Sequence, residues 1–131
     1  VIILDSQTAE WNREKAQTVT ETFLTKYGDD IDGVYAFDDG MALGVVSALQ
    51  GAGKSAGDVK IVSCNQFGEG WDAMKKGWIS GSGKQSPIDD AILAIQTAVK
   101  VANGIEIPAL QEIERAQITP ENVDSFERPT W

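Results

Sequence analysis

Polar and aromatic side chains stand just beyond the short apolar runs of this 131-residue sequence. Carboxylates and amides can bond two neighbouring hydroxyl groups at once, and an indole face can lie against the apolar C–H face of a sugar ring. The candidate ligand-binding residues are Trp11, Arg13, Asp38, Asn65 and Gln85. Together these residue types predict the binding of a neutral, polyhydroxylated small molecule.

Each candidate also has a purely structural alternative. Aspartate often caps the helix that follows it, and of the adjacent pair we expect Asp39 to cap and Asp38 to face the ligand. Trp11 could be a core residue at a helix start. Asn65 could be a turn residue, and Gln85 could bond the backbone before the next helix.

The residue types that are absent exclude many catalytic sites. The sequence has no histidine and one cysteine, so His-based triads, His metal sites and internal disulfides are excluded. No base is available to activate Cys64. An enzymatic alternative is a Mg²⁺-dependent phosphotransfer domain that uses Asp38 and Asp39. Such a domain would carry a lysine and a hydroxyl residue at the later strand ends, where Asn65 and Gln85 stand instead, so we expect no metal, no cofactor and no enzyme activity.

The net charge of −9 opposes nucleic-acid binding, because an acidic surface repels phosphate backbones. No apolar run approaches the roughly 20 residues that a membrane span requires. Val1–Asp5 has neither the basic region nor the cleavage site of a signal peptide.

Apolar runs alternate with amphipathic stretches along the chain. This alternation predicts a Rossmann-like, doubly wound parallel sheet of the α/β class with helices on both faces. Strands are expected at 1–5, 33–37, 59–64 and, more weakly, 78–81. Helices are expected at 11–27, 41–50, 70–76 and 87–102, with one short terminal helix opening at 119–121. Since the carboxyl ends of parallel strands meet at one edge, the candidate residues should share a rim.

The sequence resembles the type I periplasmic sugar-binding proteins of ABC transporters, the ribose-binding group most of all. The stretches that carry the resemblance are Ala36–Gly44, Ala48–Lys54, Val59–Ser63, Trp71–Gly77, Gln85–Pro87, Ala98–Gly104 and Ile118–Asp124. The resemblance implies two Rossmann-like lobes joined by a hinge and closing on a sugar. It also implies a membrane permease as partner and a periplasmic or extracytoplasmic location.

The resemblance also assigns roles to the candidate residues. Asp38 and Asn65 fall at positions that bond sugar hydroxyls, and Gln85 falls at the hinge side of the cleft. Trp11 matches an aromatic that stacks on the sugar ring, and Arg13 belongs to the same short motif. Ribose-type members carry Phe-Asp where this chain has Cys64-Asn65, so ribose itself is not the expected ligand.

The resemblance further implies that the chain is the C-terminal lobe alone. We expect residues 1–104 to form that lobe and residues 105–131 to form a hinge-crossing segment and tail. Without the N-terminal lobe, the apolar residues of the segment have no partner, so we expect a homodimer, strand exchange or a disordered tail. We also expect the chain to bind sugars weakly or not at all. The alternative function is the effector-binding core of a lac-repressor-type transcription regulator, which shares the fold.

Overall fold

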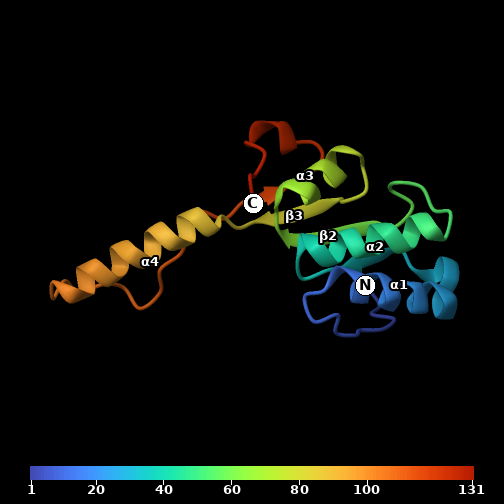
Figure 1. The fold of residues 1–131 in the computed structure, drawn as a ribbon, viewed down its shortest axis with the longest axis horizontal. Coiled ribbons are helices and arrows are strands. Elements are labelled where there is room, and N and C mark those ends of the chain that lie inside the picture. The colour runs from blue at the N-terminus through green and yellow to red at the C-terminus, as the bar shows by residue number, and fades with distance from the viewer.

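The computed structural model describes residues 1–131 and divides them into a packed body and a projecting arm (Figure 1). The arm consists of residues 85–116, which leave the sheet and return to it at one point. At that point the backbone N–H of Lys84 donates to the carbonyl of Ala116 at 2.8 Å. The rest of the chain forms the body.

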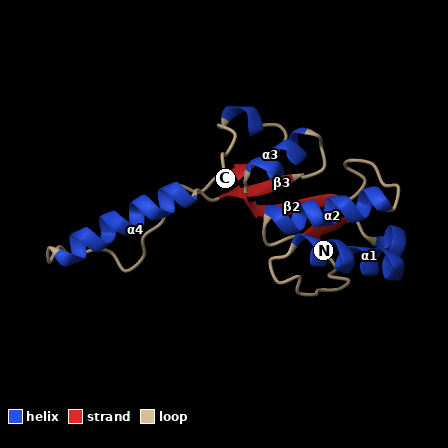
Figure 2. Ribbon diagram, viewed as in Figure 1, coloured by secondary structure: helices blue, strands red, loops and turns tan.

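The body is built on a four-stranded sheet in the order β1-β2-β3-β4 (Figure 2). The strands are β1 (Gly33–Tyr35), β2 (Lys60–Asn65), β3 (Gly81–Lys84) and β4 (Gln117–Ile118). β1, β2 and β3 are parallel, and β4 runs antiparallel to β3. Successive parallel strands alternate with helices, so the predicted α/β class with a mainly parallel sheet is confirmed.

The four α-helices are α1 (Arg13–Tyr27), α2 (Asp39–Gly51), α3 (Gly68–Lys75) and α4 (Pro87–Ala102). Side-chain caps fix where three of them begin, because each cap accepts a hydrogen bond from a backbone N–H in the first turn. The caps are Asn12 for α1, Asp38 for α2 and Ser86 for α4. None of the helices combines the length and the apolar character needed to cross a bilayer.

The core lies between the sheet and α2, which is buried along most of its length. Leu49 of α2, Ile61 of β2 and Met74 of α3 are each at most 1% exposed. α1 packs on α2 at Gly44, where an added Cβ would lie 2.3 Å from the carbonyl oxygen of Arg13. Only glycine permits this close crossing of the two helices.

The two faces of the sheet differ sharply within these residues. On β2, Ile61 and Ser63 point into the core, whereas Val62 remains 44% exposed on the opposite face. Tyr35, which pairs with Val62, is 57% exposed. Helices therefore cover one face here, where cover on both faces is expected. α4 extends away from the body and has no buried residue (Figure 1).

Three sequence-based expectations about elements are wrong. Val1–Asp5 is not a strand: Val1, Ile2 and Ile3 are more than 80% exposed, and the segment is held to the end of α1 by polar bonds from Tyr27 to Leu4 and Asp5. An apolar run becomes a strand only where another strand edge lies beside it.

The strand expected at 78–81 lies instead at Gly81–Lys84. Ile79 is buried in the core but lies outside the strand, and the strand itself consists of two glycines, a serine and a lysine, which carry no apolar signal. The expected terminal helix is only a 3₁₀ turn at Val123–Ser125.

Candidate functional site

The carboxyl ends of the parallel strands bring three candidate residues to one edge of the sheet. Asn65 is the last residue of β2 and pairs with Lys84 of β3, so Gln85 follows one residue beyond this pair. Asp38 lies three residues beyond the end of β1, at the start of α2. We call this edge the rim.

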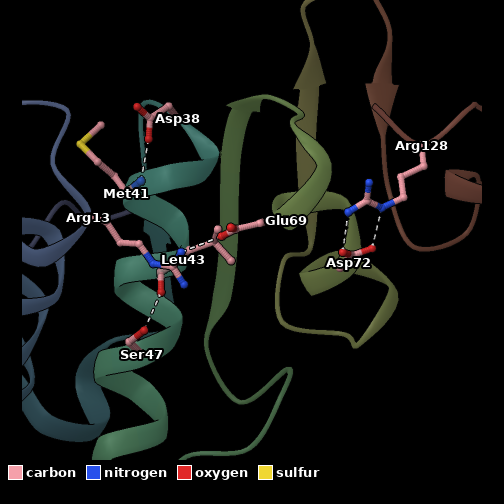
Figure 3. A network of polar contacts seen from close by, with 8 residues as sticks. All are labelled: Arg13, Asp38, Met41, Leu43, Ser47, Glu69, Asp72 and Arg128. Atoms are coloured by element: carbon pink, nitrogen blue, oxygen red, sulfur yellow. Dashed lines mark hydrogen bonds and ion pairs between the residues drawn. The ribbon is translucent and has the colours of Figure 1, made fainter. Parts of the chain in front are cut away.

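Asp38 caps α2 and is only half-buried. Its Oδ1 accepts a hydrogen bond from the backbone N–H of Met41 at 2.6 Å, as Figure 3 shows at the start of the helix. The expectation that Asp39 would be the cap is therefore wrong. The cap occupies Oδ1, and no protein donor bonds Oδ2 in this structure. The second oxygen can still accept a hydroxyl from a ligand.

Asp39 is fully buried beneath the rim and holds several elements together. Its Oδ1 accepts hydrogen bonds from the hydroxyls of Ser63 at 2.5 Å and Ser82 at 3.0 Å. Its Oδ2 accepts from the backbone N–H of Phe67 at 3.0 Å. One carboxylate thus joins the start of α2 to β2, β3 and the loop before α3. An added Cβ on Gly70 would lie 2.1 Å from Oδ2, so only glycine leaves room for this carboxylate.

The pKa of Asp39 reflects two opposed effects. Burial raises the pKa above its ordinary value because a low-dielectric surrounding disfavours the charged form. The bonds from Ser63, Ser82 and Phe67 act in the other direction, and burial dominates. Both carboxylate oxygens already have protein partners, so Asp39 has little capacity left to ligate an ion. This arrangement argues against the Mg²⁺-dependent alternative.

Exposed aromatic rings stand beside the rim. Trp11 is 69% exposed and meets Phe37 edge to face, with ring centroids 6.5 Å apart. Phe37 in turn meets Tyr35 edge to face at 5.0 Å. Trp11 is therefore not the core residue that the structural alternative proposed. Sequence reasoning missed Phe37, although it shares the strand parity of Tyr35, which places both rings on the same side of the sheet.

The turn at the end of β2 has an unusual backbone. Asn65 and Gln66 have φ of 83° and 45°, in the left-handed region that residues other than glycine seldom adopt. Gln66 is buried, and its Nε2 has no hydrogen-bond partner. Asn65, at the end of β2, is half-exposed at the rim.

Gln85 and Arg13 are already engaged with other protein groups. The Gln85 amide donates to Asp90 at 3.0 Å, within the first turn of α4. Arg13 forms an ion pair with Glu69 at 2.7 Å across α2, visible in Figure 3. Arg13 and Glu69 line a shallow hollow of about 410 Å³ that Arg128 and Trp131 also line, and Gln85 is not part of it. The structure therefore places Arg13 in a groove over α2 and α3, where its guanidinium pairs with Glu69.

This chemistry is that of a binding surface. Carboxylate and amide groups at the rim supply acceptors and donors for hydroxyls, and the aromatic rings supply flat apolar surface. The rim is open on one side, so a ligand lying on it would keep much of its surface in water.

Comparison with known proteins agrees with this picture. The sequence profile described as a periplasmic binding protein domain matches residues 1–106. The ribose import binding protein of Escherichia coli (strain K12) is 34% identical over 112 residues, which cover 86% of this chain and 37% of that protein. The xylitol-binding protein of Mycolicibacterium smegmatis is 30% identical over 122 residues, which cover 93% of this chain and 34% of that protein.

A solved structure shares the fold. The ABC transporter periplasmic solute binding protein from Actinobacillus succinogenes 130z, with bound D-allose, superposes with a TM-score of 0.86 at 31% identity. The match covers 95% of this chain and 43% of that one. The chain spans about a third of the length of the two curated relatives. These relatives are binding proteins and give no support to the transcription-regulator alternative. The chain belongs to the periplasmic binding protein family.

Proposed function

We propose that this chain is one lobe of the sugar- or polyol-binding component of an ABC import system. The observation that carries the proposal is the rim, where Asp38, Asn65 and Gln85 gather at the carboxyl ends of three strands. Trp11 and Phe37 add apolar ring surface next to these polar groups. The ligands named for the relatives, ribose, xylitol and D-allose, are small polyhydroxylated molecules that suit such a surface.

Capture of the ligand requires a second lobe. The rim contacts a sugar from one side, so half of the sugar's hydroxyls would stay bonded to water on this chain alone. An N-terminal lobe facing the rim would enclose the ligand and supply the other half of its hydrogen bonds. The arm supports this arrangement, because its apolar side chains lack a partner within the 131 residues.

The roles follow from this geometry. Asp38 accepts hydroxyls through Oδ2, Asn65 accepts and donates, and Trp11 stacks on the ring. Gln85 stands where the arm leaves the body, on the side where the two lobes join. Arg13 pairs with Glu69 in the groove over α2 and α3, and its part in ligand binding stays a prediction. The protein acts by binding and release, with a membrane permease as its partner, outside the cytoplasmic membrane.

The test uses the longer chain that includes the proposed first lobe. In that protein, Asp38→Ala should weaken sugar binding by about 1–3 kcal/mol, because a charged hydrogen bond to the ligand is lost. Calorimetry with D-allose, xylitol and D-ribose measures the change. Asp38→Asn keeps the helix cap and separates binding from folding.

Asp58→Ala is the matched control. Asp58 is an exposed acid near the amino end of β2, at the edge of the sheet opposite the rim. Its removal should leave the affinity unchanged. Equal affinity of the Asp38→Ala protein and the parent would remove Asp38 from the site.

A further inference from the structure

The turn that carries Asn65 is tied to the buried carboxylate of Asp39 on both sides. Two residues before Asn65, the hydroxyl of Ser63 donates to Oδ1 of Asp39 at 2.5 Å. Two residues after Asn65, the backbone N–H of Phe67 donates to Oδ2 at 3.0 Å. Between these bonds Asn65 and Gln66 are left-handed, and the buried Nε2 of Gln66 has no hydrogen-bond partner. Because a left-handed backbone is unfavourable for these residues, the turn needs bonds from outside it, and Asp39 supplies them.

The same carboxylate lies next to the other two rim residues along the chain. Asp38 precedes Asp39 directly, at the start of α2. Ser82 of β3 donates to Oδ1 of Asp39 at 3.0 Å, three residues before Gln85. Asp39 is fully buried and Ser82 is 4% exposed, so this bond is shielded from water. The three backbone segments that carry the rim side chains therefore meet at one carboxylate.

The helix α3 closes the space around this carboxylate. A Cβ added at Gly70 would lie 2.1 Å from Oδ2, 2.5 Å from Cγ and 2.8 Å from Cβ of Asp39. Gly70 lies within α3 and its φ is not positive, so the local backbone gives no reason for a glycine. Alanine would favour the helix more. The glycine is therefore explained by the space that the Asp39 side chain occupies.

We propose that Asp39 is a positioning residue for the ligand, which sets the spacing of the Asp38, Asn65 and Gln85 side chains at the rim. This inference rests on the proposed function of the rim as a sugar-binding surface. Asp39 is fully buried, so a ligand on the rim does not reach it. Hydrogen bonds weaken steeply away from their preferred distance and angle. A small shift of the turn would therefore lower the affinity even in a folded protein.

Gly70→Ala tests the proposal in the longer chain that includes the proposed first lobe, because it displaces the Asp39 carboxylate without removing it. Calorimetry with D-allose, xylitol and D-ribose should show affinity lower by about tenfold or more, the weakening of one or two hydrogen bonds. Gly51→Ala is the matched control, since Gly51 ends α2 and a Cβ added there meets nothing within 4 Å. That variant should bind like the parent. Parent-like affinity in Gly70→Ala would overturn the proposal.

Two substitutions of Asp39 separate positioning from stability. Asp39→Asn keeps an oxygen for the Phe67 N–H, and the serine hydroxyls can accept from its amide nitrogen, because a hydroxyl both donates and accepts. Its affinity should stay within about threefold of the parent's, whereas Asp39→Ala should lose about tenfold or more. Leu49→Ala removes a buried side chain near the other end of α2 and should keep the parent's affinity. Equal losses of affinity in Asp39→Ala and Leu49→Ala would show that Asp39 acts through stability alone.

The ligand-free chain gives a readout that does not depend on sugar. In NMR spectra of the 131-residue protein, the side-chain amide signals of Asn65 and Gln85 report the surroundings of these groups. Both signals should shift in Gly70→Ala and in Asp39→Ala, and should stay in place in Gly51→Ala. If they shift while the longer parent binds no sugar, the proposed function fails and the positioning of the rim by Asp39 stands. Unshifted signals in both variants would overturn the positioning role.

Discussion

The body and the arm of this molecule each contain an apolar helix, but only the helix of the body is buried. α2 in the body is apolar and buried on nearly every side, and Leu49 is 1% exposed. α4 in the arm carries a cleaner apolar stripe, yet Ile95 is 66% exposed. Both helices follow a parallel strand after a short connection. The difference lies in the partner, because α2 finds the sheet and α1 within the chain and α4 finds neither.

This contrast shows that an amphipathic pattern predicts a helix face to be buried, but does not say which segment or molecule buries it. In the body, each partner follows within a few tens of residues. In the arm, no partner for α4 lies within the 131 residues, and the proposed first lobe would supply it. The arm therefore contributes little to the stability of the 131 residues, whereas the body holds the rim in place.

The same truncation in the two regions should give the largest contrast. Leu49→Ala removes a fully buried side chain and should lower the free energy of unfolding of the body by about 2–5 kcal/mol. Ile95→Ala removes an exposed one and should change it by less than about 0.5 kcal/mol. Urea denaturation followed by tryptophan fluorescence measures both. Similar losses would show that α4 is packed in solution.

Removal of the buried carboxylate should have the next largest effect. Asp39→Ala leaves the donors on Ser63, Ser82 and Phe67 without an acceptor, which should cost about 1–3 kcal/mol in the free energy of unfolding. Asp38→Ala removes only the α2 cap, and a loss of about 1 kcal/mol is expected. If Asp38→Ala were the more costly of the two, the network described beneath the rim would be incorrect.

The pH dependence of Asp39 gives a smaller and distinct signal. Burial raises its folded-state pKa above the unfolded value of 3.8, so the folded chain binds the extra proton between these two values. The contribution of this group to stability therefore increases as the pH falls through that window. Denaturation at neutral pH and near pH 4 should show that the stability of the parent rises relative to Asp39→Asn. A constant difference between the two proteins would contradict the raised pKa.

Ion pairs on the body surface should have the smallest effects. Arg13 pairs with Glu69 through one contact, and the two side chains are 47% and 65% exposed, so Arg13→Ala should cost less than about 0.5 kcal/mol. Arg128 donates two bonds to Asp72, from Nε at 3.0 Å and from a terminal nitrogen at 2.8 Å. Arg128→Ala should therefore cost more than Arg13→Ala, up to about 1 kcal/mol. The reverse order in thermal denaturation would give Arg13 a role that the structure does not show.

Patterns whose partners lie nearby in the sequence were predicted well. The apolar run at 59–64 and the apolar stretch at 41–50 that ends before Gly51 indicated a strand and a helix of the α/β body, and both are present. Asp38, Asn65 and Gln85 were expected at strand ends, and parallel pairing does bring those ends to one edge. Whether they hold a ligand stays a prediction, as does the division of the chain at residue 104.

Other features depend on geometry that residue types do not encode. Two adjacent aspartates have the same capping propensity, and only the position of Ser63 and Ser82 decides that Asp39 turns inward. Val1–Asp5 carries a strand-like apolar run, but a strand needs an edge to pair with. Gly81–Lys84 has no apolar signal and is a strand through its pairing with β2 on one side and β4 on the other. Phe37 gains its place at the rim from its edge-to-face contact with Trp11.

We propose that this chain is one of two lobes that together enclose a sugar. The most direct measurement is calorimetric titration of D-allose and xylitol into the 131-residue chain and into a longer chain that carries the proposed first lobe. We expect the longer protein to bind the sugar with a micromolar dissociation constant. The 131-residue chain should show no saturable heat of binding at micromolar sugar concentrations, because the open rim leaves the ligand half-hydrated. Micromolar binding by the 131-residue chain alone would contradict it.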